Sequence, residues 1–154
     1  MIGINYVDSV VVYNYYSEGE RTYYYGTRFD GVRVELTQAA NIQKNGMENA
    51  DAFLVKIPND GSLPKPYMPP EQWKKLVEDQ KQEAFTLDKA HNDFVVIVKK
   101  EDLGINITLP TGRINDQDYQ SGFYQHIREK YGFTYTVNTV GVYLLIPRFE
   151  VGGA

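Results

Sequence analysis

The stretch Asp93-Phe-Val-Val-Ile-Val98 decides the fold class of this 154-residue chain. Five apolar residues follow one another in it, and four of them are β-branched. A short apolar run that ends at turn-forming residues is typical of a β-strand buried on both faces. Here the polar run Lys99-Lys-Glu-Asp102 and then Gly104 end it. We therefore predict a central strand of a sheet at this position.

Strand patterns occur on both sides of this stretch. Residues 9–16 are β-branched and aromatic, and a turn at residues 17–20 leads into a second such run, which predicts a hairpin. Residues 32–36 alternate apolar and charged side chains, as half-buried strands do, and residues 53–57 place Phe53, Val55 and Ile57 on one face of a further strand. Further strands are predicted over residues 21–25, 85–87, 105–109, 133–137 and 141–147, with a turn at 138–139 and a frayed tail from residue 151.

Two extended loops are predicted between the strands. Residues 37–50 are small and polar, with a tight turn at Asn45-Gly46. Residues 59–70 hold four of the chain's seven prolines, which excludes a helix or a central strand over that range. We expect both segments to be exposed and to reach beyond the body of the domain.

Helical spacing follows the second loop and recurs near the C-terminus. Pro70 suits the first position of a helix, and the apolar spacing after it predicts a helix over residues 70–81 with Trp73 as its anchor on the sheet. Within residues 114–131, an aromatic or apolar residue recurs every four positions from Tyr119 to Tyr131, which indicates a second helix that ends at Gly132. The whole pattern predicts a single mainly β domain over residues 1–154. It would be a small barrel or sandwich of about seven to nine short strands with one or two packed helices.

Charge and composition narrow the function classes. The chain has 20 acidic and 16 basic residues and a formal net charge of −4, which disfavours a nucleic-acid binder that works through phosphate contacts. It has no cysteine, so thiolate metal sites and cysteine nucleophiles are excluded. No signal peptide and no apolar run of about 18 residues is present, so we expect a cytoplasmic product that does not enter a membrane. Five lysines are expected on a solvated surface: Lys74, Lys75, Lys81, Lys99 and Lys100.

Motifs that would indicate catalysis are missing. The chain has two histidines, His91 and His126, without the His-Glu-x-x-His spacing of a zinc hydrolase. It also lacks a phosphate-binding glycine loop and the Gly-x-Ser-x-Gly turn of a serine hydrolase. We therefore predict no enzyme activity, no cofactor and no metal site. A small hydrolase built on His91 or His126 is retained as an alternative.

Tyrosine is the compositional outlier, with 13 copies. Tyrosine favours strands and surfaces that are apolar on one side and wet on the other, so plain sheet packing accounts for most of them. Enrichment at subunit interfaces is a second explanation. A third is a carbohydrate-binding β-module that stacks sugars on exposed tyrosines, for which the candidates are Tyr23, Tyr24, Tyr25 and Tyr67.

The first 60 residues resemble a known family. Four segments carry the resemblance: Val10-Val-Val-Tyr-Asn-Tyr-Tyr16, Gly31-Val-Arg-Val-Glu35, Lys44-Asn-Gly-Met-Glu-Asn-Ala-Asp51 and Val55-Lys-Ile-Pro58. Their order is similar to that of phage and prophage head–tail connector proteins of Gram-positive bacteria, also called minor capsid or neck proteins. The chain departs from that family at Val34, where a tryptophan is frequent, and its C-terminal third matches weakly.

The resemblance implies a structural virion protein of the phage neck, a head-completion or stopper-like ring subunit that joins the portal and adaptor to the tail. Implied partners are other copies in the ring, the portal or adaptor ring and the tail terminator. DNA would pass through the lumen without specific binding, and the protein would be assembled in the host cytoplasm. A tail terminator or tail-tube-like ring protein is the alternative within this class. Interface residues are expected in the two loops, at Asn45, Met47, Glu48, Pro66, Tyr67 and Met68.

Overall fold

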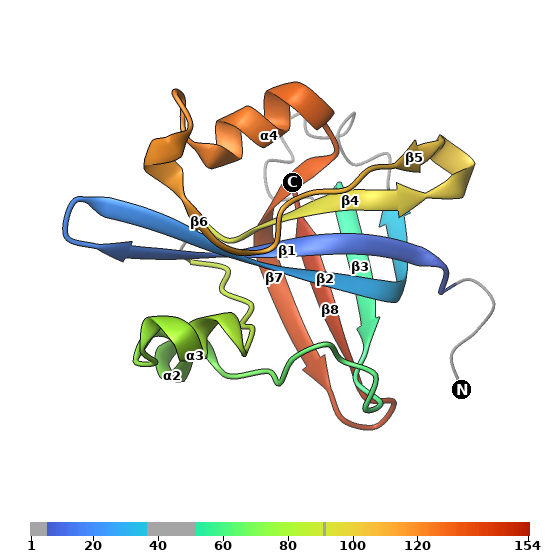
Figure 1. Ribbon diagram of the computed structural model, residues 1–154. Helices are drawn as coiled ribbons and strands as arrows, with labels where there is room; N and C mark the ends of the chain where they lie inside the picture. The colour runs from blue at the N-terminus through green and yellow to red at the C-terminus, as the bar shows by residue number, and fades with distance from the viewer. Residues whose placement is uncertain (1–5, 37–51, 91) are drawn as a thin grey trace, which may run out of the picture.

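A computed structural model describes residues 6–36, 52–90 and 92–154 of the chain. In this described part, eight strands form one antiparallel sheet (Figure 1). They are β1 (Asp8–Glu18), β2 (Arg21–Leu36), β3 (Phe53–Pro58), β4 (Phe94–Lys100), β5 (Ile105–Asn106), β6 (Gly112–Asn115), β7 (Thr134–Tyr143) and β8 (Arg148–Gly153).

The pairing order of the sheet runs β1-β2-β3-β8-β7-β4-β5, and β6 pairs with β2. Strand β1 also pairs with β4, through Val10↔Ile97 and Tyr13↔Phe94 among others, so the sheet curves back on itself. The result is a compact ring-like sheet and not a regular barrel. The predicted mainly β class and its number of strands are confirmed for the described residues.

Strand β4 contains the stretch that decided the fold class. It pairs with β1 on one side and with β7 on the other, and its end pairs with β5, as expected of a central strand. Its side chains alternate between two hydrophobic clusters. Val95 and Ile97 pack in one cluster with residues of β2, β3 and β8, while Phe94 and Val96 pack in the other with residues of helix α4. The run lacks polar alternation because both faces of this strand are buried.

Strand β2 is one strand of 16 residues where the sequence predicted two. Gly26 and Gly31, which lie between the two predicted strands, are inside this one strand. Glycine is required at position 26 because the Tyr13 ring packs closely on the backbone there. A Cβ atom at Gly26 would lie 2.7 Å from Cε1 of Tyr13. The Tyr13 ring crosses Gly26, and its hydroxyl donates a hydrogen bond to the carbonyl of Pro110 at 2.7 Å. A glycine inside a strand can therefore mark a site of packing, and not its end.

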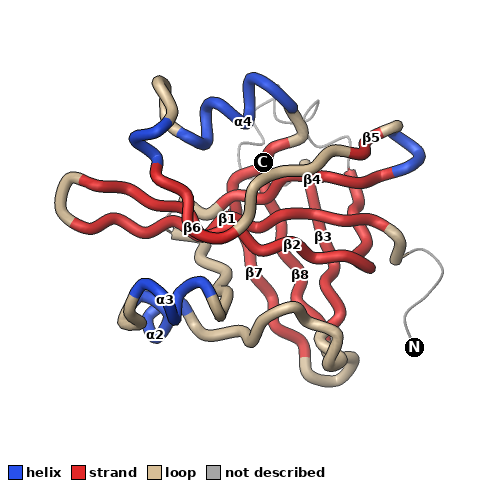
Figure 2. The backbone as a smooth tube through the Cα atoms, viewed as in Figure 1, coloured by secondary structure: helices blue, strands red, loops and turns tan. Residues whose placement is uncertain are grey.

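Three α-helices in the described part lie on opposite sides of the sheet, as Figure 2 shows in blue. Helices α2 (Pro70–Lys74) and α3 (Glu78–Gln82) lie on one side, and α4 (Phe123–Tyr131) lies on the other. The helix predicted over residues 70–81 is thus two short helices, because Val77 has extended backbone with φ −71° and ψ 163°. Trp73 is 1% exposed and packs on Tyr25, which confirms its predicted role as anchor.

Helix α4 is shorter than the helix predicted over residues 114–131. The first part of that range forms β6 and the 3₁₀-helix η2 (Asp116–Asp118). Asp116 accepts a hydrogen bond from the backbone N–H of Phe123 at 2.7 Å, which fixes the start of α4. The predicted end at Gly132 is confirmed, with φ +70°. A second 3₁₀-helix, η1 (Glu101–Leu103), follows β4.

The C-terminal residues differ most from expectation. Strand β7 continues through the predicted turn at 138–139, and the turn lies at residues 144–147 instead. The tail, which was expected to fray, forms β8 between β3 and β7. Val151 and Gly153 are buried there, and a Cβ atom at Gly153 would overlap the carbonyl oxygen of Thr136. The tail is ordered because two strands pair with it, which composition alone does not indicate.

Candidate functional site

The predicted interface residues fall into two groups. Asn45, Met47 and Glu48, with the loop over residues 37–50, lie outside the described residues. Pro66, Tyr67 and Met68 lie in the proline-rich segment between β3 and α2.

That proline-rich segment is held against the domain. The backbone N–H of Met68 donates to the carbonyl of Phe85 at 2.9 Å, and the N–H of Phe85 donates to the carbonyl of Pro66 at 3.0 Å. The Tyr67 ring packs on Phe149, with 4.8 Å between ring centroids. Residues 59–69 lie between β3 and α2, and the Tyr67 side chain packs against the main hydrophobic core. Its role in an interface stays a prediction.

The most exposed large apolar side chains among the described residues lie in the turn that joins β7 to β8. Three consecutive residues in it are far more exposed than apolar side chains usually are: Leu144 at 81%, Leu145 at 97% and Ile146 at 70%. Val142 and Tyr143 before them are also exposed. We call Val142–Ile146 the apolar tip. In Figure 1 it lies at the end of the β7–β8 hairpin, away from the three helices.

Residues at the start of β8 and after β3 hold the apolar tip in place. Arg148 donates to the carbonyl of Ile146 at 3.1 Å and pairs with Glu150 at 2.6 Å, while its guanidinium carbon lies 4.3 Å from the Tyr143 ring centroid. The N–H of Asn59 also donates to the carbonyl of Pro147 at 3.0 Å. The sequence predicted this run as part of a strand over residues 141–147. Its end at Pro147 was the available signal that it forms a turn.

The arrangement of the described residues provides no support for the alternative of a hydrolase built on His91 or His126. His126 lies on α4 with its ring 4.7 Å from the Tyr119 ring centroid, and His91 lies outside the described residues. In the part of the chain that the structure describes, no three His, Cys, Asp or Glu side chains gather as a metal site would require. Likewise, none of its helices has the length and apolar composition needed to cross a bilayer.

Two of the four tyrosines proposed as exposed sugar platforms are buried. Tyr24 is 6% exposed and packs on Phe94, and Tyr25 is 3% exposed and packs on Trp73. Burial raises the pKa of the Tyr25 hydroxyl to about 12, so it stays protonated at neutral pH. The expectation that these two rings are exposed was therefore wrong. Tyr23 and Tyr67 are half-buried.

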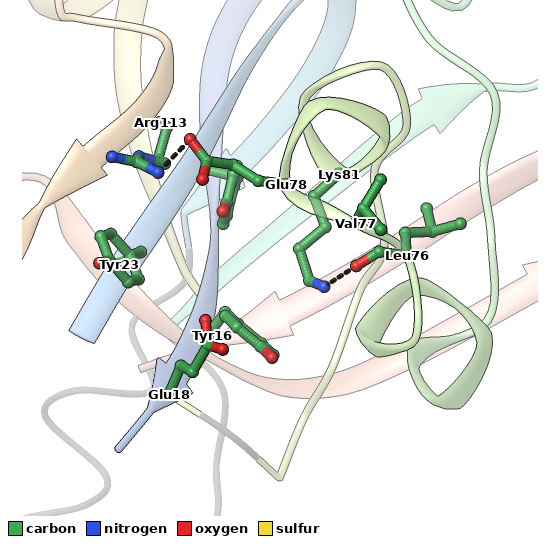
Figure 3. Close-up of a pocket in the computed structure, with 9 residues that line it drawn as sticks. Tyr16, Glu18, Tyr23, Leu76, Val77, Glu78, Lys81 and Arg113 are labelled. Carbon is green, nitrogen blue, oxygen red and sulfur yellow. Dashed lines mark hydrogen bonds and ion pairs between the residues drawn. The ribbon is translucent and has the colours of Figure 1, made fainter. Parts of the chain in front are cut away.

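A pocket of about 330 Å³ lies between the β1–β2 hairpin, β6 and the α2–α3 connection (Figure 3). Five aromatic or apolar residues and four charged ones line it: Tyr16, Tyr23, Tyr25, Leu76, Val77, Glu18, Glu78, Lys81 and Arg113. We call it the tyrosine pocket. No local sequence pattern predicts this pocket, because its residues come from four separate segments.

Lys81 forms one wall of the tyrosine pocket. It is 3% exposed, and its ammonium group donates to the carbonyls of Lys74, at 2.9 Å, and Leu76. The same nitrogen lies 4.1 Å from the ring centroid of Tyr16. Burial lowers the pKa of Lys81. The expected solvated surface is therefore wrong for Lys81, and Lys100 likewise lies in ion pairs with Asp8 and Asp102.

Arg113 and Glu78 close the opposite side of the tyrosine pocket. Arg113 on β6 forms an ion pair with Glu78 on α3, and its guanidinium carbon lies 4.8 Å from the Tyr23 ring centroid. Figure 3 shows this pair on the far side of the pocket from the dashed bond between Lys81 and Leu76. Both cations of the pocket are thus bound to groups of the protein itself.

Comparison with known proteins identifies a family but no activity. The chain belongs to a family of unknown function, DUF6751, whose match spans residues 6–153. No curated protein and no solved structure matches the chain.

Proposed function

We propose that this protein is a structural subunit of a phage neck, a head-completion or stopper-like ring protein between the portal or adaptor and the tail. The apolar tip is the observation that supports this proposal best. Monomeric proteins rarely expose a contiguous apolar patch of this kind, and such patches mark contact surfaces. A protein that acts by assembly needs a rigid body and a projecting contact element, and the sheet and the apolar tip supply both.

The open edge of β7 adds to the contact surface. Strand β4 pairs with β7 only at Thr134–Thr136, and β8 occupies one edge of β7 from Val137 to Tyr143. No described strand pairs with the other edge at Val140–Tyr143. An unpaired edge beside exposed apolar residues is a place where a second chain can add backbone hydrogen bonds. Contacts between different surfaces of identical subunits close into rings when the rotation fits.

The net charge suits the proposed position as well. The chain carries −4, and a channel that must pass DNA without holding it benefits from repulsion of the phosphates. The same contact surface would serve a tail terminator or a tail-tube-like ring. In either position the protein would be part of the virion, at or near the head–tail junction.

Substitution in the apolar tip tests the proposal. A phage that lacks the gene would be supplied with the wild-type protein, with Leu145→Asp, or with Leu103→Asp as a control at an exposed residue elsewhere. We expect Leu145→Asp to leave the free energy of unfolding of the isolated protein unchanged, because the side chain has no buried contacts. We also expect it to lower the yield of infectious particles at least tenfold and to leave heads and tails unjoined. Full yield with Leu145→Asp would contradict the proposed role of the apolar tip.

A further inference from the structure

The tyrosine pocket is separate from the apolar tip and shares no residue with it. Its volume of about 330 Å³ lies at the lower end of the range for small-molecule sites. It is built on regular elements, with Tyr16 on β1, Tyr23 and Tyr25 on β2 and Arg113 on β6. A pocket on paired strands keeps its shape, so a ligand would meet a largely preformed site.

The charged side chains that line the pocket disfavour both anionic and cationic ligands. The lining has two cations, Lys81 and Arg113, and two carboxylates, Glu18 and Glu78. Lys81 is held by two backbone carbonyls and the Tyr16 ring, and Arg113 is held by Glu78 and the Tyr23 ring. An anionic ligand would be repelled by the two carboxylates, and a cationic ligand would be repelled by Lys81 and Arg113. The pocket therefore favours a ligand without net charge.

An uncharged ligand in the tyrosine pocket would contact hydrogen-bonding groups that lie next to aromatic rings. Tyr25 lines the pocket with its hydroxyl protonated, as the raised pKa of about 12 requires. The ion pair of Arg113 with Glu78 presents a donor next to an acceptor, which matches two adjacent hydroxyl groups. The rings of Tyr16 and Tyr23 add apolar surface with a polar end. Adjacent hydroxyls on a partly apolar ring are the chemistry of a sugar.

We propose that the tyrosine pocket binds a neutral sugar ring, with adjacent hydroxyls on the Arg113–Glu78 pair and the ring against Tyr23. This site differs from the sugar platform considered from sequence, which required open tyrosine faces. It is also independent of the neck role, because a sugar could bind whether or not the apolar tip contacts another protein.

Saturation-transfer NMR on the full chain tests this site, since it detects weak binding. The probes are glucose, galactose, mannose and N-acetylglucosamine, with glucosamine and glucuronate as charged analogues. We expect saturation transfer to at least one neutral sugar, at least tenfold weaker transfer to its charged analogue, and loss of the signal in Arg113→Met and in Tyr23→Ala. Arg148→Met and Tyr143→Ala, in the matching cation–ring pair at the apolar tip, should bind as the wild type does.

Folding of each variant is checked separately, so that loss of binding can be assigned to the missing contact and not to unfolding. Near-ultraviolet circular dichroism and urea denaturation should show Arg113→Met folded, because Arg113 is partly exposed. The proposal is overturned if no neutral sugar receives saturation, if a charged analogue binds more tightly, or if the signal survives in folded Arg113→Met and Tyr23→Ala.

Discussion

The ammonium nitrogen of Lys81 lies 4.1 Å from the centre of the Tyr16 ring, and the same lysine is 3% exposed. Its ammonium group donates to the carbonyl of Lys74, the last residue of helix α2, and to the carbonyl of Leu76, two residues beyond the helix. A five-residue helix is too short to be stable by itself, so its last carbonyls need partners from outside the helix. Lys81 supplies them and joins α2 to α3.

Replacement of Lys81 by methionine therefore tests this link. Lys81→Met keeps most of the packing of the side chain but leaves the carbonyls of Lys74 and Leu76 without the ammonium donor. We expect the free energy of unfolding to fall by about 1–3 kcal/mol, the usual cost of an unsatisfied buried acceptor. Urea denaturation measures it, with the exposed Lys75→Met as control. Equal stability of the two variants would show that water replaces the ammonium at no cost.

Trp73 should contribute more than any other residue of α2. Its ring is 1% exposed and packs on Tyr25, with 5.5 Å between centroids. Trp73→Ala is expected to lower the free energy of unfolding by roughly 3–5 kcal/mol because it leaves a large cavity. Val77→Ala, at a 65% exposed apolar position of the same segment, should cost under about 0.5 kcal/mol. A small loss for Trp73→Ala would mean that α2 is not anchored as described.

Asp93 gives the stability a pH dependence with a definite sign. Its carboxylate accepts hydrogen bonds from the side chain of Asn14 and the backbone of Tyr15, each at 2.8 Å, and from the backbone of Asp88. Burial nevertheless raises its pKa to about 7, above the ordinary value of 3.8. The folded state therefore holds this proton where the unfolded state has lost it, and this group's contribution to stability falls as the pH rises from about 4 to 7.

Unfolding of the wild type and Asp93→Asn at pH 5 and pH 8 measures that contribution. Asp93→Asn no longer titrates, so the excess stability of the wild type over the variant should shrink by about 1–3 kcal/mol between these pH values. Asp79→Asn, at an exposed carboxyl, should run parallel to the wild type. An excess stability that stays constant or grows towards pH 8 would contradict the raised pKa.

Gly153 should not tolerate a side chain. It pairs with Phe53 on one side and Val137 on the other, and a Cβ atom would overlap the carbonyl oxygen of Thr136. We expect Gly153→Ala to lower the free energy of unfolding by about 1–3 kcal/mol, which is the usual cost of overpacking a filled site. Ala154→Gly, at the exposed next position, serves as the control in thermal denaturation. Matching melting temperatures for the two variants would mean that the tail is not held between β3 and β7.

The sequence was informative where one face, or both faces, of an element is buried. The run over residues 94–98 predicted β4, and the spacing around Trp73 predicted its helix, because burial imposes the pattern directly. Strand β8 was missed because its glycines resemble a flexible tail, and their role depends on the partner strands β3 and β7. Only tertiary contacts distinguish the two cases.

The candidate sites were less predictable than the fold. Lysine is usually a surface residue, whereas Lys81 is buried in the short helix α3 that follows the extended backbone at Val77. The tyrosine pocket needs four segments to meet, which no local pattern reports. The residues of the apolar tip were predicted as part of a strand over residues 141–147, and their place in a turn depends on where β7 ends.

The location of the protein in the phage particle tests the central claim most directly. Particles from an induced culture that carries the gene would be labelled with gold-conjugated antibody against this chain and viewed by electron microscopy. The proposed function predicts label at the head–tail junction. Purified particles without label, whose denatured proteins also lack this chain, would contradict the assignment as a virion protein.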